Sequence, residues 1–581
     1  ADYDAIVADP RNTIQLDDAV QQATERREQT MGTDGRLVVD GSDEVTLVNL
    51  SEKLLVPVLS KLCNLCPDGG VWMNTQRPEW NDANNALAGF GLSMVTTYQL
   101  RRHLERVEGL FGGLEDSQVM LSSRVADWLD EVASAFEATE GKRAWTPSER
   151  RAELDRLGLA FERYRKAVYA DGPGEGVSRP VESIRALLQR AIERIERTIE
   201  SNRRHDGLYH AYNVIRLTRD EAKVSHLYEM LEGVMAVLGS KKLTAPEAIS
   251  VIDALFDSAV YREDQRSFML YPDRRLPDFF EKNRPSPERV EAVPLLLALV
   301  DDSDESLMVR DVEGVYRFAA SLRNADDVEA ALKRLQKNAR WARAVEEDRA
   351  AVLDLWEETF DHHAFTGRSG TMYGYEGLGC IYWHMVSKLL LSVQEVVWAA
   401  REGGADVATL QALLERYDRV RSGLGPGKTP KEYGAFPTDP YSHTPKHAGA
   451  QQPGMTGQVK EEILTRFGEL GVRMRDGEVH FDPFMLRRSD FLTAPSRLEL
   501  PSGDGVDLEA GQLGFTLGGV PIVYTLADDR RDGFSVRVTD GSGRTEHREA
   551  SSLGRAASNH VFRRDGAVGR VDVRVPAAHV R

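Results

Sequence analysis

The chain has 581 residues, and its 92 acidic and 74 basic side chains give a formal net charge of −18. With 41% hydrophobic and 29% charged residues, the composition indicates a globular protein with a core and argues against a disordered or fibrous chain. The acidic balance argues against a protein that binds mainly nucleic-acid phosphates, because such binding needs clustered Lys and Arg.

No segment of the sequence predicts a membrane span or an exported protein. The longest apolar run, from Val293 to Val300, has eight residues, whereas a membrane-spanning helix needs about 20. Three cysteines cannot form a disulfide framework, and the first thirty residues contain no apolar signal-peptide core. We therefore expect a cytoplasmic protein with no membrane and no nucleic-acid partner, although a start at Ala1 leaves an upstream segment open.

The apolar pattern is mainly helical from about residue 47 to about 470. The clearest case is a helix over 181–199, where apolar residues recur every three or four positions opposite a face of Arg and Glu. Within the helical region, apolar alternation around Glu313-Gly314 predicts a hairpin over 306–319. Further helices are expected at 48–65, 83–111, 116–139, 148–169, 244–260, 345–360, 376–402, 405–421 and 457–470.

Short alternating runs replace the helical pattern after residue 470. The turn signal Asp476-Gly477 between two such runs predicts a β-hairpin. Further strands are expected at 513–517, 521–524, 535–538 and 571–575. We therefore divide the chain into an N-terminal segment over 1–46, a helical body over 47–470 and a C-terminal β-sandwich over 471–581.

One loop concentrates polar groups directly before a long apolar helix: Glu79, Trp80, Asn81 and Asp82. In one interpretation Asp82 or Asn81 caps the helix and Glu79 is solvated. In the other the loop binds a sugar, because amides, carboxylates and an aromatic face hold sugars, and a glycosidic oxygen needs a proton donor.

Three stretches, in the same order along the chain, resemble the cellobiose and chitobiose phosphorylases of glycoside hydrolase family 94. They are Glu79 to Asp82 with the helix that follows, Glu376 to His384, and Gly454 to Gly457 with the hairpin after it. The resemblance implies an (α/α)6-type helical toroid followed by a C-terminal β-sandwich. Only 78 residues precede Glu79, so we expect a toroid incomplete at its N-terminus, with an inserted subdomain within about 112–345.

The resemblance also implies roles for individual residues. The general acid falls on Glu79, where the family has Asp. Phosphate binding falls on a protonated His384 and on the amides of the glycine-rich loop, with Thr456 near Pro453, where the family has a hydroxyl residue. The predicted phosphate site is therefore His384, Gly454, Thr456 and Gly457, and the predicted sugar contacts are Trp72, Arg77, Trp80, Asn81, Asp82, Glu376 and Tyr382. Because an indole can stack on a sugar ring, Trp383 is a further candidate for stacking, beside Trp72 and Trp80.

Three functions follow from this arrangement. The first is inverting phosphorolysis of a β-glucan oligosaccharide to a sugar 1-phosphate, with inorganic phosphate as co-substrate and no other cofactor. The second is an inverting hydrolase or transglycosylase, which needs a base about 6.5 to 9.5 Å from the acid; the candidates are Asp82, Glu376 and Asp439. The third is a non-catalytic carbohydrate-binding subunit.

Metal binding is not expected. The single pair Cys63 and Cys66 lacks the second pair of ligands that a zinc site needs, and the histidines have no metal-ligand spacing. The glycosidic linkage, the substrate length and the oligomeric state stay open, with a homodimer among the options.

Overall fold

The computed structural model describes the chain except residues 1, 11–12, 15, 40–43, 75–86, 274–276, 361–378, 437–440, 445–448, 451, 454–455 and 528–532. The chain divides into two compact units. Unit 1 is Ala1–Tyr382 with Thr444–Ala448, and unit 2 is Trp383–His443 with Gly449–Arg581. None of the helices described by the structure has the length and apolar run needed to cross a membrane.

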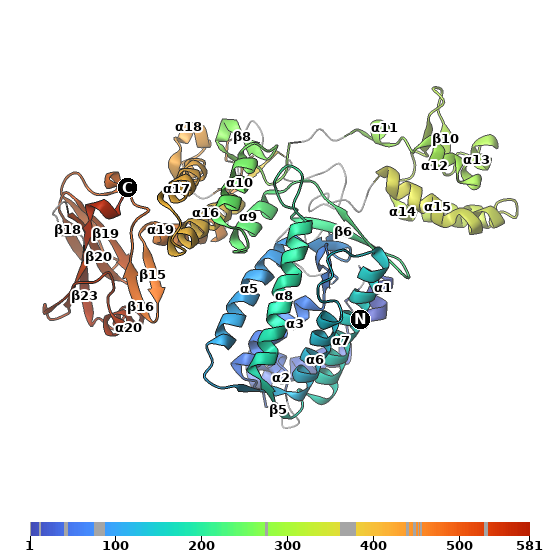
Figure 1. Ribbon diagram of the computed structural model, residues 1–581. Helices are drawn as coiled ribbons and strands as arrows, with labels where there is room; N and C mark the ends of the chain where they lie inside the picture. The colour runs from blue at the N-terminus through green and yellow to red at the C-terminus, as the bar shows by residue number, and fades with distance from the viewer. Residues whose placement is uncertain are drawn as a thin grey trace. The chain divides into compact units, whose positions relative to one another are not determined.

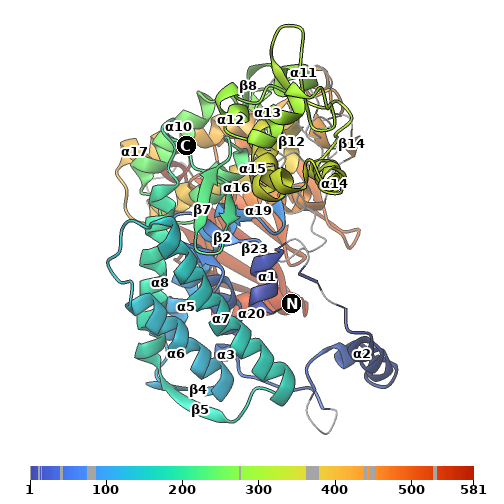
Figure 2. The ribbon, with the colours of Figure 1, turned by 90° about the vertical axis from the view of Figure 1, so that its right-hand side faces the viewer.

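A group of long helices forms one part of unit 1, with α5 packed along α8 and α6 along α7 (Figures 1 and 2). The predicted helix over 181–199 is confirmed as α8, whose apolar stripe, including Ile184 and Ile195, is fully buried. α7 starts with a capping box between Thr146 and Glu149, which satisfies the first amides of the helix. The five helices are α3 (Leu50–Leu62), α5 (Met94–Gly112), α6 (Ser123–Glu137), α7 (Pro147–Asp171) and α8 (Val181–Ser201).

An antiparallel sheet in the order β1-β2-β3-β6-β7 lies in the same unit. The helix predicted over 83–111 is interrupted, because residues 91–93 form β3 and Ser93 caps α5, which starts at Met94; residues 83–86 lie outside the described residues. Gly91 fits this strand because a side chain there would collide with Leu87. The strands are β1 (Leu65–Cys66), β2 (Gly70–Trp72), β3 (Gly91–Ser93), β6 (Tyr212–Leu217) and β7 (Ala222–His226).

Unit 1 also contains smaller elements, which lie before, between and after the long helices and the sheet strands in the sequence. Two-stranded sheets join β4 to β5 and β8 to β9. These elements are α1 (Tyr3–Ala8), α2 (Asp18–Met31), η1 (Gly32–Arg36), β4 (Gln118–Ser122), β5 (Gly176–Pro180), α9 (Leu231–Gly239), α10 (Ala245–Phe256), β8 (Tyr261–Arg262), η2 (Glu263–Gln265), β9 (Ser267–Phe268) and β12 (Ile381–Tyr382).

Residues 279–360 have a hydrophobic core of their own, which includes Leu296, Phe318 and Trp356. The predicted hairpin over 306–319 is confirmed, since β10 and β11 pair antiparallel. The elements are α11 (Phe279–Lys282), α12 (Pro287–Glu291), α13 (Pro294–Asp301), β10 (Met308–Arg310), β11 (Tyr316–Phe318), α14 (Ala325–Gln336) and α15 (Ala342–Phe360).

Unit 2 begins with helices and continues with strands. α16 packs against both α17 and α19, so it is the central helix of this part. The elements up to α19 are α16 (Trp383–Glu402), α17 (Val407–Ser422), η3 (Gly425–Gly427), α18 (Pro430–Tyr433), β13 (Tyr441–Thr444), β14 (Gln452–Pro453) and α19 (Thr456–Glu469).

The strands of unit 2 include the predicted hairpin at Asp476-Gly477, formed by β15 and β16. A five-stranded sheet has the order β19-β20-β23-β21-β22, in which only the β20–β23 pair is parallel. The elements are β15 (Val472–Arg475), β16 (Glu478–Phe481), η4 (Arg488–Asp490), β17 (Ser496–Glu499), β18 (Gly505–Leu508), β19 (Gln512–Leu517), β20 (Val520–Ala527), β21 (Ser535–Asp540), β22 (Thr545–Arg548), α20 (Arg555–Arg563), β23 (Val568–Pro576) and η5 (Ala577–His579). Closure of helices into a toroid and packing of strands into a sandwich stay predictions.

Candidate functional site

The start of α16 carries the predicted phosphate-binding residue His384, and the start of α19 carries two others, Thr456 and Gly457. His384 is the second residue of α16, and Thr456 and Gly457 are the first two residues of α19. The two helices pack against each other, and His384 Nε2 lies 4.0 Å from the Glu461 Oε2 atom on α19. Two segments that are more than 70 residues apart therefore meet at the imidazole.

The imidazole of His384 is mostly shielded from solvent, with 20% of its side chain exposed. Burial, together with the nearby charges of Lys388 and Lys460, lowers the pKa of His384 to about 4. Without phosphate the ring is therefore neutral at pH 7, and the protonated His384 expected beside a bound phosphate stays a prediction. A neutral imidazole still offers one N–H donor, whereas the positive charge comes from the two lysines.

Glu461 is the buried anion of this cluster, with only 5% of the residue exposed. Its Oε1 atom lies 4.0 Å from Lys460 Nζ, which is within ion-pair range but longer than a hydrogen bond. Lys388, Lys460 and Glu461 together carry a net charge of about +1, and the N-terminus of α19 adds a partial positive charge. The chemistry of this cluster suits a small anion such as phosphate.

Two tryptophans that were considered for sugar stacking are core residues. Trp72 is 3% exposed and its Nε1 donates a hydrogen bond to the Gly89 carbonyl at 2.9 Å. Trp383 is fully buried, with its ring 5.2 Å from that of Tyr433 and the Lys428 ammonium 4.8 Å from its centroid. Both indoles therefore have protein neighbours on the surfaces that a sugar would need.

Of the remaining predicted site residues, the structure describes Tyr382. Tyr382 ends β12 with its side chain half-buried. Those outside the described residues are Arg77, Glu79, Trp80, Asn81, Asp82, Glu376, Asp439 and Gly454.

Sequence reasoning missed Lys388, Lys460 and Glu461. A usable signal was present in the spacing, because Lys388 follows His384 by four residues, and Lys460 follows Thr456 by the same interval. Residues four apart share one face of a helix, so Lys388 lies on the face of α16 that carries His384. For a metal, the part of the chain that the structure describes offers no cluster of three or more ligating side chains.

The comparison with known families gives one match. Residues 276–363 match the model described as GH149 phosphorylase insertion domain 2. No curated protein matches the chain. The matched segment covers the independent core of residues 279–360 and begins inside the region 112–345, where an insertion was expected. The match supports a glycoside phosphorylase, without singling out the cellobiose and chitobiose phosphorylases of family 94.

Proposed function

We propose that this chain is an inverting glycoside phosphorylase that cleaves a β-glucosidic bond with inorganic phosphate held at the start of α19. The phosphorylase insertion-domain match supports the reaction class. The observation that carries the proposal is the position of His384 against α19, with Lys388 on its own helix and Lys460 on the other.

In this reaction Glu79 protonates the glycosidic oxygen as the bond to the anomeric carbon breaks. A phosphate oxygen attacks the anomeric carbon from the opposite face, and the products are a sugar 1-phosphate of inverted configuration and a shortened sugar. Phosphate is already an anionic nucleophile, so the reaction needs no second carboxylate as a base.

The cationic cluster orients the phosphate. Lys388 and Lys460 attract the dianion as point charges, and the His384 N–H donates to one of its oxygens. The buried Glu461 carboxylate, 4.0 Å from the imidazole, favours the protonated ring once a phosphate dianion has also arrived. Phosphate binding is therefore expected to raise the pKa of His384 from its low starting value.

The test is phosphate dependence, measured by ³¹P NMR on the purified chain with a panel of β-linked gluco-oligosaccharides. We expect a sugar 1-phosphate to appear only with added phosphate. Release of free reducing sugar at full rate in phosphate-free buffer would exclude phosphorolysis and favour the hydrolase. Replacement Glu79→Gln should lower turnover by about 10²- to 10⁴-fold, whereas the exposed control Glu175→Gln should not.

A further inference from the structure

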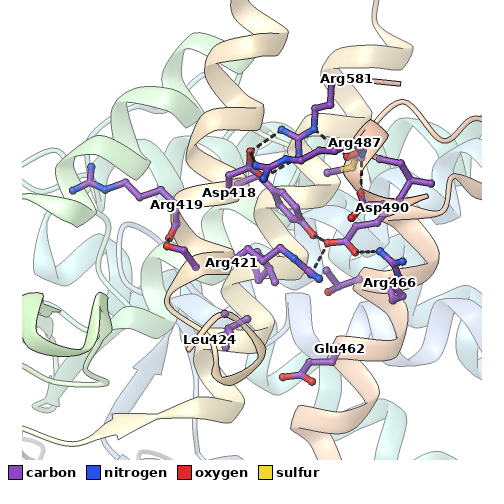
Figure 3. Close-up of a pocket in the computed structure, with 17 residues that line it drawn as sticks. Asp418, Arg419, Arg421, Leu424, Glu462, Arg466, Arg487, Asp490 and Arg581 are labelled. Atoms are coloured by element: carbon purple, nitrogen blue, oxygen red, sulfur yellow. Dashed lines mark hydrogen bonds and ion pairs between the residues drawn. The ribbon is translucent and has the colours of Figure 1, made fainter. Parts of the chain in front are cut away.

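A pocket in unit 2 is lined by the last turns of α17, by α19 from Glu462 to its end and by residues 485–490 (Figure 3). Its volume is about 660 Å³, which is within the range of small-molecule sites. Five arginines and four carboxylates line it, in a chain where acidic residues outnumber basic ones by 92 to 74. We call it the arginine pocket; its arginines are Arg419, Arg421, Arg466, Arg487 and Arg581.

One carboxylate in the pocket holds two guanidinium groups. Glu469 is only 4% exposed, and it accepts a hydrogen bond from the Tyr417 hydroxyl at 2.5 Å. Arg421 Nη1 lies 2.5 Å and Arg466 Nη1 3.0 Å from its two oxygens. Because two cations share one anion, the group keeps a net charge of about +1. The side chains of Arg421 and Arg466 stay 42% and 44% exposed.

A second carboxylate repeats this pattern. Asp418 accepts two hydrogen bonds from Arg581, at 2.7 and 2.8 Å, and one from Arg487 Nη2 at 2.5 Å. The Arg487 side chain remains 53% exposed. Figure 3 shows Arg421, Arg466, Arg487 and Arg581 around the pocket, with Asp418 next to Arg581. Arg421, Arg466 and Arg487 are thus each held by a carboxylate while about half of the side chain stays exposed to solvent.

The other two carboxylates of the lining do not cancel this charge fully. Asp490 accepts a hydrogen bond from the Arg487 backbone amide at 2.8 Å, so it is engaged in the turn of η4. With Glu462 the lining totals five guanidinium groups against four carboxylates. The hydrophobic side chains of Leu390 and Leu424 also line the pocket, which gives it a surface for the body of a ligand.

We infer that the arginine pocket binds the phosphate group of a small phosphorylated sugar, at a site separate from the one where phosphate reacts. Guanidinium forks match the geometry of a phosphate and bind it through paired hydrogen bonds. The volume leaves room for a hexose beside the phosphate. The inference goes beyond the proposed function, because it does not depend on the reaction that the enzyme catalyses.

The experiment is isothermal titration of the purified chain with glucose 6-phosphate, inorganic phosphate and glucose. The variants are Arg421→Gln and Arg487→Gln in the pocket, His384→Asn at the start of α19, and Arg544→Gln as an exposed arginine control in the same unit. We expect glucose 6-phosphate to bind wild type, His384→Asn and Arg544→Gln equally. Each pocket variant should bind at least about tenfold more weakly.

Several outcomes would overturn the inference. These are no binding of glucose 6-phosphate at millimolar concentration, equal binding by the pocket variants, equal affinity for glucose or inorganic phosphate, or loss of binding in His384→Asn. Circular dichroism checks the fold of each variant. If Arg421→Gln does not fold, Arg487→Gln decides, because its side chain is more exposed and Asp418 keeps Arg581 as a partner.

Discussion

The two halves of α19 carry cationic clusters of opposite design. In the first half, Glu461 lies 4.0 Å from the neutral imidazole of His384 and 4.0 Å from the Lys460 ammonium. In the second half, Glu469 holds two arginines at 2.5 and 3.0 Å. Short pairs fix arginines in place for recognition, whereas loosely paired lysines and a neutral imidazole can reorganise around an anion that arrives and leaves.

The largest expected effect tests the first half of the helix. Replacement His384→Asn removes the donor of the proposed phosphate site and should lower kcat/KM for phosphorolysis by about 10²- to 10³-fold. The exposed His547→Asn serves as the control and should keep wild-type activity. An unchanged kcat/KM in His384→Asn would show that the first half of α19 does not hold the reacting phosphate through His384, and would contradict the contrast between the two halves.

The next effect tests the second half. Replacement Glu469→Gln removes the charge shared by Arg421 and Arg466 and weakens the acceptor of the buried Tyr417 hydroxyl. We expect the free energy of unfolding to fall by about 2 kcal/mol, measured by urea denaturation, with kcat retained at a temperature where the variant is folded. The control Glu415→Gln is exposed on α17 and should change stability little.

A smaller effect separates charge from hydrogen bonding in the first half. Replacement Lys388→Gln keeps a polar side chain but removes one positive charge, and it should raise the KM for phosphate by about tenfold with little change in kcat. Lys431→Gln, an exposed lysine on α18, is the matched control. If Lys388→Gln and Lys431→Gln have the same KM for phosphate, groups other than Lys388 attract the phosphate.

The smallest effect concerns pH. Because the pKa of His384 falls from 6.5 to about 4 on folding, the unfolded chain binds more protons in this range. Stability contributed by neutral His384 should therefore be present above pH 6.5 and decline as the pH falls toward 4. NMR titration of the imidazole should give a pKa near 4 without phosphate and a higher value with it. Comparison of pH-dependent unfolding with His384→Asn isolates this contribution.

Much of the local structure could be predicted from residue patterns. The stripe of α8 and the turn signals at Glu313-Gly314 and Asp476-Gly477 lead to the elements that the structure contains. Predictions failed where tertiary packing overrides periodicity. Within the predicted helix 83–111, residues 91–93 are an example, because Gly91 pairs with Val214 in a sheet, whereas α5 confirms the helix from Met94 onward. The strands at 212–226 were missed altogether for the same reason.

The proposed phosphate site, His384 with the start of α19, could also be predicted only in part from the sequence. The motif resemblance named His384 and the start of α19 without any knowledge of their contact. It could not predict the protonation state of His384, because the low pKa results from burial and from Lys460 on another helix. The arginine pocket had no motif at all, since its charged residues come from segments between 417 and 581.

The sequence by itself determined the helical and strand periodicities, the turns and the residue types that phosphate chemistry needs. Those features depend on neighbours within a few positions along the chain, so they can be recognised in one dimension. Only the tertiary structure decided that His384 is neutral, that Trp72 and Trp383 belong to the core, and that two carboxylates each hold two arginines. Burial and charge pairing are set by residues distant in sequence, because solvent access and electrostatic interaction depend on distance in space.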